Sequence, residues 1–290
     1  MGKFTGMLFT SDFDHTISDH DGNIPQKNIR AIEHFIAEGG YFCLNTGRSI
    51  PAARSRAELV PCNAPCLLYN GGACYDYRSE KLIFAHSMPE EAENLLTLLE
   101  QEDVGIEIQG IAHHYSKAVI PSREPMLRKS GMETKITQDI PKPWMKIVLC
   151  GKEGTILESY DQVDPKERER FARLRLRVQE LCGEDYYVTA SMPRVIEIGN
   201  PNCTKATGAR HLAKLLGCHT VICAGDAPND TPMLQDADYA FCPSDAHPEI
   251  LALPNIISTV SSDQGAVAEA IRYLEKKSET EAFLQMDNGQ

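Results

Sequence analysis

The sequence predicts an α/β fold: a doubly wound, Rossmann-like parallel-sheet core that is interrupted by an inserted α+β domain. Two observations support this prediction. Short apolar runs alternate with amphipathic segments near both ends of the chain, which is the pattern of a parallel sheet covered by helices. The middle of the chain departs from this pattern but has helices and strands of its own, and enough length for a separate core. We therefore expect a core from residues 1–86 and 189–290, and an inserted domain from residues 87–188.

The first part of the chain indicates strand, helix, strand, helix, strand. The apolar run Met7-Leu8-Phe9 precedes turn-forming residues, which is typical of a buried strand. Pro25 opens a helix with one apolar face, and Gly39-Gly40 stops it. The runs YFCLN and CLLYN predict two further strands, separated by a helix over about residues 51–59. The carboxyl ends of such strands meet at one edge of a sheet, where α/β proteins place their sites.

The inserted segment has a different order of elements. The run EEAENLLTLLEQE predicts a helix, and both GIEIQGIAHHYS and WMKIVLCG predict strands. The run KERERFARLRLRVQELCG predicts an amphipathic helix, whose arginines we interpret as a solvated face rather than as a binding patch. The α/β pattern then returns with four short apolar strands, a helix over residues 204–216 and a closing helix. In order, these strands and the closing helix are VIEIG, VICAGD, YAFC, NIIS and GAVAEAIRYLEKK.

Composition excludes several classes of partner. The chain has 290 residues and a formal net charge of −12, which argues against nucleic acid and anionic membranes as partners. No apolar run reaches the length of a membrane span, and we expect no membrane partner. Ten cysteines occur without a CxxC pair, mostly inside apolar runs, which suits reduced thiols in a cytoplasmic protein. We expect a monomer or a small homo-oligomer.

Acidic residues follow two of the predicted strands. Asp12 and Asp14 come directly after the first strand, and two acids so close repel each other unless a cation or a donor compensates. Asp226 and Asp230 follow VICAG and are four residues apart, so both can face one side at a helix start. A cluster of oxygen ligands of this kind suits a hard cation such as Mg²⁺. The alternative readings are an acidic loop that closes a strand and a helix that Asp226 merely caps.

Two more strands end in polar or glycine residues. Thr46-Gly47-Arg48 follows the second strand, and Asn70-Gly71-Gly72 follows the third. The recurrence of such endings favours a site at this edge of the sheet over chance.

The order of these motifs resembles the haloacid dehalogenase-like superfamily, and most closely its Cof-type phosphatases with a large α/β cap. The resemblance rests on Asp12-Phe13-Asp14-His15-Thr16, Thr46-Gly47-Arg48, Lys205 and Gly225-Asp226-Ala227-Pro228-Asn229-Asp230, and it spans nearly the whole chain. The inserted domain falls where these proteins carry their cap. The resemblance implies a Mg²⁺-dependent phosphatase of small phosphorylated metabolites, with sugar phosphates as the first expectation.

The resemblance also implies roles for single residues. Asp12 would be the nucleophile that becomes an aspartyl-phosphate, and Asp14 the general acid and base. The metal would be held by Asp12, Asp226 and the backbone carbonyl of Asp14. Asn229 and Asp230 would complete or orient that shell. The phosphoryl oxygens would be held by Thr46 and Lys205, with Gly47, Arg48 and Asn229 as further phosphate-binding candidates.

One position departs from the subfamily. The residue after the second aspartate is commonly Gly there, and here it is His15. We interpret His15 as a spectator, with the alternative that it touches the leaving group or changes the proton affinity of Asp14. In the inserted domain, GIAHHYSK, with His114, is a candidate for contacts to the substrate.

Two other functions remain open at this point. A phosphosugar mutase would use the same Asp12 and Asp14 but return the phosphoryl group to another hydroxyl of the substrate. A phosphometabolite sensor would use the cleft only for binding. Binding alone does not require two adjacent acids, so the sequence favours the phosphatase.

Overall fold

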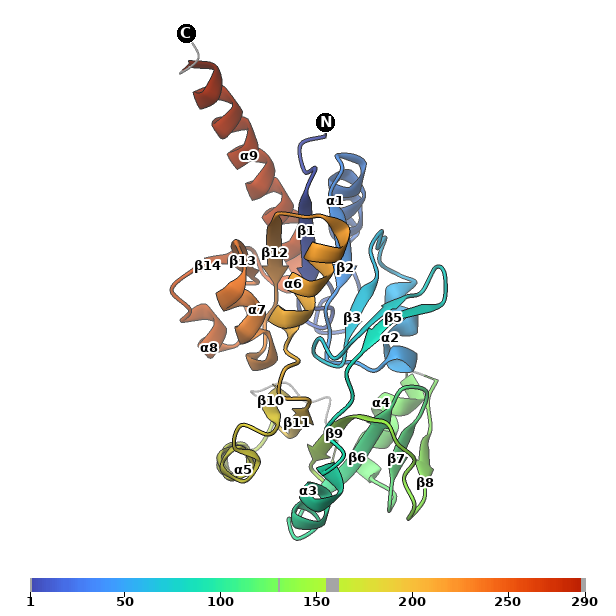
Figure 1. Ribbon diagram of the computed structural model, residues 1–290. Helices are drawn as coiled ribbons and strands as arrows, with labels where there is room; N and C mark the ends of the chain where they lie inside the picture. The colour runs from blue at the N-terminus through green and yellow to red at the C-terminus, as the bar shows by residue number, and fades with distance from the viewer. Residues whose placement is uncertain (1, 130, 155–161, 288–290) are drawn as a thin grey trace.

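The computed structural model describes residues 2–129, 131–154 and 162–287. Figure 1 shows two parts, one above the other, with both chain termini in the upper part. The upper part contains the first and last portions of the chain, and the lower part contains the middle portion. We call the upper part the core and the lower part the cap.

The core is built on a five-stranded sheet in the order β14-β13-β12-β1-β2, and every pairing in it is parallel. Its strands in chain order are β1 (Met7–Ser11), β2 (Tyr41–Leu44), β12 (Thr220–Ala224), β13 (Tyr239–Cys242) and β14 (Ile256–Ser258). In the register, Ser11 at the end of β1 lies opposite Ala224 at the end of β12. The segments that follow these two strands therefore leave the sheet side by side. The predicted doubly wound parallel sheet is confirmed.

Helices cover both faces of this sheet because successive side chains of a strand point to opposite faces. Phe9 of β1 lies in a cluster with α1 and α9, whereas its neighbour Leu8 lies in a cluster with α6, α7 and α8. Both side chains are fully buried. The core helices are α1 (Gln26–Ala37), α2 (Ile50–Ala57), α6 (Lys205–Leu216), α7 (Thr231–Asp236), α8 (Pro248–Leu251) and α9 (Ala266–Asp287). Short 3₁₀ turns occur at η2 (Pro228–Asp230) and η3 (Ser262–Gln264).

The third predicted strand touches the core sheet at one point but belongs mainly to a second sheet. An isolated parallel bridge between Asn45 and Leu67 connects it to the end of β2. Its main partners are antiparallel, in a three-stranded sheet of order β3-β4-β5. These strands are β3 (Cys66–Leu68), β4 (Ala73–Asp76) and β5 (Lys81–Ala85).

The cap is a six-stranded sheet in the order β10-β11-β9-β6-β7-β8, in which the pair β7–β8 is parallel and the others are antiparallel. One face packs on helices α3 and α5 through an apolar cluster. The cap strands are β6 (Gly105–Gly110), β7 (His114–Ser116), β8 (Thr134–Ile136), β9 (Trp144–Cys150), β10 (Tyr187–Met192) and β11 (Val195–Gly199). The cap helices are α3 (Ala92–Leu99), η1 (Pro121–Arg123), α4 (Glu124–Lys129) and α5 (Pro165–Cys182).

One sequence prediction about these strands is wrong. VIEIG was assigned to the core, but it forms β11, which pairs antiparallel with β9 and β10 in the cap sheet. An alternating apolar pattern predicts a strand but does not say which sheet the strand joins. We therefore propose that the cap ends near Gly199 rather than at residue 188.

The chain enters and leaves the cap at adjacent points. The side-chain amide of Asn200, just after β11, donates to the backbone carbonyl of Ser87 at 2.7 Å. The two connections between core and cap are thereby tied together. In the three described ranges, no helix is both apolar enough and long enough for a membrane span.

Candidate active site

The ends of β1 and β12 bring two aspartates to one point, as the parallel register requires. The backbone N–H of Asp12 donates to the carbonyl of Ala224 at 2.9 Å, which extends the sheet by one residue beyond β1. Thr16, in the turn after β1, donates its hydroxyl to a carboxylate oxygen of Asp226 at 2.7 Å. The loop after β1 and the loop after β12 are thus held together by their polar side chains.

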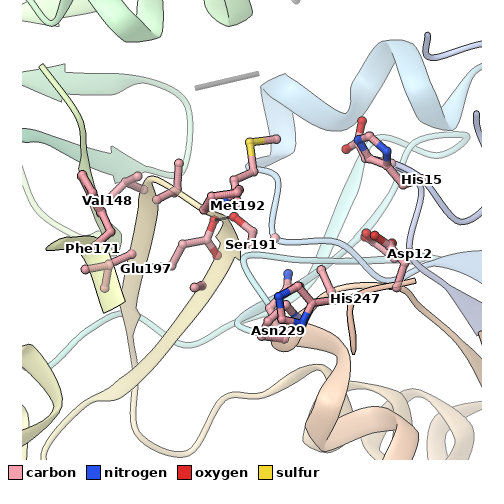
Figure 2. Close-up of a pocket in the computed structure, with 18 of the residues that line it drawn as sticks. Asp12, His15, Val148, Phe171, Ser191, Met192, Glu197, Asn229 and His247 are labelled. Atoms are coloured by element: carbon pink, nitrogen blue, oxygen red, sulfur yellow. Dashed lines mark hydrogen bonds between the residues drawn. The ribbon is translucent and has the colours of Figure 1, made fainter. Parts of the chain in front are cut away.

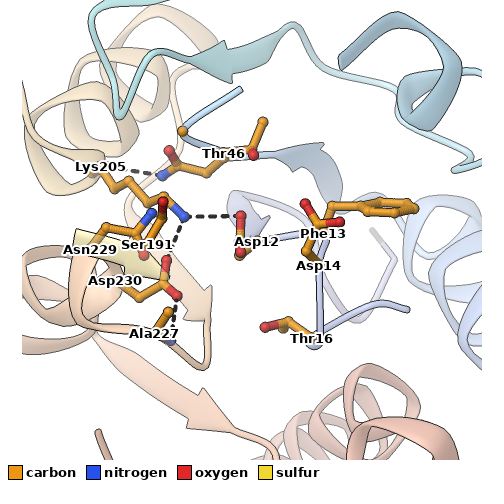
Figure 3. A network of polar contacts seen from close by, with 12 residues as sticks. Asp12, Phe13, Asp14, Thr16, Thr46, Ser191, Lys205, Ala227, Asn229 and Asp230 are labelled. Atoms are coloured by element: carbon orange, nitrogen blue, oxygen red, sulfur yellow. Dashed lines mark hydrogen bonds and ion pairs between the residues drawn. The ribbon is translucent and has the colours of Figure 1, made fainter. Parts of the chain in front are cut away.

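Asp230 organises the loop that carries Asp226. One of its carboxylate oxygens accepts the backbone N–H groups of Asp226 and Ala227, both at 3.0 Å. Gly225 is required at this turn, because a Cβ there would lie 2.4 Å from the Asp230 carboxyl carbon. Asp230 is completely buried, and its other oxygen faces Lys205 (Figure 3).

Lys205 lies at the start of α6, where Thr204 caps the helix by accepting the N–H of Thr207 at 3.2 Å. Its ammonium is 3.0 Å from Asp12 Oδ1 and 2.5 Å from Asp230 Oδ1, and the side chain has no exposed surface (Figure 3). Burial opposes the charged form, but the two carboxylates outweigh it and raise the pKa of Lys205. Lys205 is therefore a permanent cation in the floor of the site.

The site carries more negative charge than positive charge. Ligand oxygens of Asp12, Asp226 and Asp230 all lie within 4.8 Å of one another. Burial, reinforced by the neighbouring carboxylates, raises the pKa of Asp12 to about 7 and raises that of Asp226 well above its usual range. Three acids against Lys205 leave two negative charges uncompensated when all are ionised. A site of this charge with oxygen donors only fits a hard divalent cation.

Asp14 points to a different partner. Arg48 Nε and Nη2 donate to its two carboxylate oxygens at 2.7 and 2.8 Å. Burial alone would raise the pKa of Asp14, but the guanidinium outweighs it and lowers the pKa to about 2. Asp14 is thus ionised and neutralised by Arg48, and its carboxylate is separate from the cluster around Lys205.

Arg48 was predicted as a phosphate contact, and the structure shows how much of it is available for one. Two of its nitrogens bind Asp14, while Nη1 is buried without a hydrogen-bond partner in the described part of the chain. Arg48 lines the same cavity as Asp12 and Thr46. The Nη1 amino group, with both of its N–H donors, therefore remains for a ligand.

Thr46 and Gly47 form the loop between β2 and α2. The Thr46 hydroxyl accepts the backbone N–H of Arg48 at 3.3 Å, and its side chain is buried. A Cβ on Gly47 would meet Asn70 Oδ1 at 2.9 Å and Glu197 Oε2 at 3.1 Å. Gly47 is therefore a point of close approach between this loop and its neighbours, in addition to any contact with phosphate.

Asn229 connects two of the predicted motifs. Its amide nitrogen donates to Asn70 Oδ1 at 3.3 Å, and its own Oδ1 is buried without a partner among the described residues. Asn229 also lines the cavity, so this unpartnered acceptor belongs to the wall of the site.

A cavity of about 830 Å³ lies between core and cap. Figure 2 shows that its core side carries Asp12, His15 and Asn229, while its cap side carries residues such as Ser191 and Glu197. The cap wall continues into an apolar part made by Val148, Phe171 and Met192 (Figure 2). The cavity is large enough for a phosphorylated metabolite.

His15 adopts a backbone conformation with φ +59°, in the left-handed region that favours glycine. Its Nδ1 lies 2.6 Å from Nδ1 of His20, whose Nε2 lies 3.1 Å from Asp245. The left-handed φ explains why glycine suits this position, and the contact with His20 shows what the histidine side chain does instead.

Several polar residues of the cavity were missed by sequence reasoning. Lys146 and Glu197 are buried on the cap face that lines it, as is Arg123. In the sequence, Glu197 stands between two isoleucines, Lys146 is the one polar residue of the run WMKIVLC, and Arg123 lies in the short segment PSR. None of these local patterns says that the side chain faces a cavity. His114, which was named, is fully buried there, and its Nε2 lies 2.7 Å from Ser49 Oγ of the core.

Comparison with known proteins identifies the family. The family model of haloacid dehalogenase-like hydrolases matches residues 9–271. The protein YxeH of Bacillus subtilis (strain 168), which carries a provisional assignment as a phosphatase, is 26% identical over 274 residues, or 92% of this chain and 97% of that one.

Two solved structures show the same fold. A haloacid dehalogenase-like hydrolase from Bacteroides thetaiotaomicron superposes with a TM-score of 0.74, 19% identity, and coverage of 93% of this chain and 99% of that one. The subclass IIB sugar phosphatase BT4131 superposes with a TM-score of 0.72, 16% identity, and coverage of 93% and 98%. The resemblance inferred from the motifs is confirmed, and the chain belongs to the haloacid dehalogenase-like hydrolase family.

Proposed function

We propose that this phosphatase hydrolyses small phosphorylated metabolites, with sugar phosphates first among them, through an aspartyl-phosphate on Asp12 and with Mg²⁺ as its cofactor. The observation that carries the proposal is the uncompensated charge of the buried cluster around Lys205. Three carboxylates whose oxygens lie within 4.8 Å of one another, beside one ammonium, line or adjoin a cavity of metabolite size. Such a cluster has a physical reason to exist if it binds a cation and, with it, a phosphate.

Asp12 and Asp226 are the residues that would hold the metal, since both carboxylate oxygens of Asp230 already accept from Lys205 or from backbone N–H groups. When bound, the metal would neutralise the repulsion between the Asp12 carboxylate and the phosphate dianion. Asp230 then keeps the loop and Lys205 in place. Asn229 contributes its unpartnered acceptor to the same wall.

The covalent step begins with a carboxylate oxygen of Asp12, which attacks phosphorus while the bond from phosphorus to the ester oxygen breaks. Lys205, 3.0 Å from Asp12, and Thr46 would hold the phosphoryl oxygens during this transfer. The alkoxide that leaves takes a proton from Asp14. Water then attacks the aspartyl-phosphate, returns a proton to Asp14, and releases orthophosphate and the Asp12 carboxylate.

The ion pair between Arg48 and Asp14 determines whether Asp14 can donate or accept a proton in the substrate-free protein. With its pKa lowered to about 2, Asp14 is a proton acceptor at neutral pH and not yet a donor. We propose that the incoming phosphate draws Arg48 toward itself through the free Nη1, and so weakens the hold on Asp14. Asp14 can then carry the proton that the leaving group needs.

The test is a phosphate-release screen over phosphorylated sugars, nucleotides and cofactors, with Mg²⁺ and with a chelator. We expect steady release that requires Mg²⁺, and Asp12→Asn should lower kcat by at least about 10³-fold because the nucleophile is lost. Release that is insensitive to Asp12→Asn would overturn the mechanism.

Two further readings are decided by the same screen. A mutase would form an isomeric phosphoester, require a bisphosphate activator and release little orthophosphate. A sensor would bind a phosphorylated metabolite, seen by calorimetry, without any release. Either result would replace the proposed function.

A further inference from the structure

We propose that Lys146 and His114 of the cap are positioning residues: they hold the core loop Thr46–Ser49, so that the phosphoryl-binding loop is fixed only while the cap is docked. The inference rests on the proposed function, because it gives this loop the task of binding the phosphoryl group. On this view the cap completes the catalytic geometry in addition to covering it.

Both ends of the loop are held from the cap. Lys146, on β9, donates its ammonium to the carbonyl of Gly47 at 2.6 Å, although it belongs to the cap sheet. His114, on β7, has Nε2 2.7 Å from the hydroxyl of Ser49, the residue that caps α2 by accepting the N–H of Ala52 at 3.3 Å. The catalytic candidates Thr46 and Arg48 are the residues directly before and after Gly47.

The Lys146 contact is part of a closed circuit. Lys146 pairs with Glu197 at 3.0 Å, and Glu197 accepts the amide of Asn70 at 2.6 Å. The backbone N–H of Asn70 donates to the carbonyl of Thr46 at 3.2 Å, so the circuit returns to the same loop. The absence of a Cβ on Gly47 is what allows Asn70 and Glu197 to approach it.

The His114 contact is held from behind. Glu107 has no exposed surface, and its Oε1 lies 3.2 Å from His114 Nδ1. Arg123 binds the same carboxylate through Nη2 at 2.5 Å and Nε at 3.2 Å. Glu107 and Arg123 therefore hold the imidazole of His114 in place where it contacts the core. Such rigid support is what a group needs if it is to orient another segment within a fraction of an ångström.

The cap offers a matched control for Lys146. Gln109, on β6, is the register partner of Lys146, is equally buried, and lines the same cavity. Its amide nitrogen, however, donates to Glu107 at 2.9 Å, within the cap. Replacing each residue by Met makes a similar change in shape at neighbouring points of the wall, but only the change at Lys146 removes a contact with the core loop.

The experiment measures acetyl phosphate hydrolysis with Mg²⁺, because this donor has only acetate as its leaving group. Lys146→Met alone leaves Glu197 buried without its cation, so the test variant is K146M/E197Q, compared with Q109M. We expect kcat of K146M/E197Q to fall at least about 10-fold. Q109M should stay within about two-fold of wild type, because Arg123 still holds Glu107, and with it His114, through two hydrogen bonds. Equal kcat values for wild type and K146M/E197Q would overturn the proposal, since Lys146 would then act only on larger substrates.

A conservative rescue tests His114. His114→Ala should also lower kcat for acetyl phosphate, and His114→Gln should restore part of it, because the glutamine amide can reach the Ser49 hydroxyl. Thermal melting of each variant checks that the fold is kept. A His114→Gln variant as slow as His114→Ala, at equal melting temperature, would count against a positioning contact with Ser49.

Hydrogen exchange separates this inference from the proposed function. Amide exchange of a peptide covering residues 45–57 is compared in substrate-free wild type, K146M/E197Q and Q109M. Faster exchange in K146M/E197Q alone would support the positioning role even if the wild type released no phosphate and the proposed function failed. Unchanged exchange in both variants would overturn it, whatever the activity.

Discussion

The core and the cap each contain a fully buried charged side chain that lies between two titratable neighbours. The two clusters differ in their net charge. In the core, Lys205 lies between Asp12 and Asp230, with Asp226 close by. In the cap, Glu107 lies between Arg123 and His114. In the cap cluster one guanidinium balances one carboxylate, whereas the core cluster has two negative charges in excess when its three carboxylates are ionised.

This difference in net charge distinguishes a cluster that only stabilises the fold from one that is suited to bind a ligand. Arg123 outweighs the effect of burial and holds the pKa of Glu107 well below its usual range, so the cap carboxylate is stable as an anion. In the core, burial and neighbouring acids instead raise the pKa values of Asp12 and Asp226. A balanced cluster needs nothing from outside, while an unbalanced one is completed by a ligand.

The largest expected effect on folding comes from the balanced cluster. Glu107→Gln leaves Arg123 buried without a counter-ion, and arginine cannot escape by losing its proton. We expect the free energy of unfolding to fall by about 4 kcal/mol, measured by urea denaturation. Arg123→Met should cost less, because Glu107 keeps its contacts with Gln109 and His114 and, unlike arginine, can be neutralised by a proton. A loss below about 1 kcal/mol would mean that the cap cluster is not the closed unit that its contacts indicate.

Lys205→Met should affect activity more than stability. Loss of the ammonium removes the proposed phosphoryl contact and leaves Asp12 unshielded, so kcat/KM should fall by about 10²- to 10³-fold. The cost in stability should be smaller than for Glu107→Gln, because the freed carboxylates can take up protons. Lys205→Arg serves as a control, because it keeps the positive charge but changes the shape of the side chain. If Lys205→Met unfolds the protein as readily as Glu107→Gln does, the contrast between the two clusters fails.

The excess charge also predicts how stability depends on pH when no metal is present. The pKa of Asp12 is about 7 in the folded protein against an ordinary value of 3.8, so the folded state binds more protons between these limits. Stability should therefore fall as pH rises through this window, by about 2–3 kcal/mol between pH 5 and pH 8. Asp14 and Glu107, whose pKa values are lowered, contribute in the opposite sense only at more acidic pH.

Mg²⁺ should cancel this dependence, since it binds the folded state with Asp12 and Asp226 ionised. Melting temperatures measured from pH 5 to pH 8, with Mg²⁺ and with a chelator, check both statements. Asp12→Asn should flatten the chelator curve. A metal-free protein that becomes more stable toward pH 8 would contradict the charge excess.

The smallest expected effect concerns His15, at the edge of the site. Relief of its left-handed backbone by His15→Gly should raise the free energy of unfolding by about 1 kcal/mol, less any contribution from the contact with His20. We expect the pH–rate profiles of wild type and His15→Gly to superpose. A shifted acidic limb would show that His15 changes the proton affinity of Asp14.

Much of the core was predictable, for a reason that particular residues show. Asp12 and Asp226 each follow an apolar strand, and parallel pairing of β1 with β12 necessarily brings such strand ends together. Lys205 was identified through the resemblance, and its place between Asp12 and Asp230 follows from the start of α6. Local sequence and sheet geometry were sufficient in these cases.

The cap was predictable only as secondary structure. Glu107 and Gln109 alternate with isoleucines, which gives a strand but leaves open whether the polar face meets water or the core. Lys146 and Glu197 pair across β9 and β11, a register that local sequence does not fix. The assignment of VIEIG to the core failed for the same reason. The pair Arg48–Asp14 was missed because two motifs were each read for their own role in phosphate chemistry.

The hydrogen bond between Asn200 and Ser87 has a consequence for the history of such a chain. The segment that forms the cap begins and ends at nearly the same place, so its removal would leave a gap that a short peptide can close. A domain whose two ends are adjacent can be inserted, removed or exchanged without changing the path of the chain through the core. A foreign module grafted between Ser87 and Asn200 could therefore bring new substrate preferences, provided that it keeps contacts with the core loop like those of Lys146 and His114.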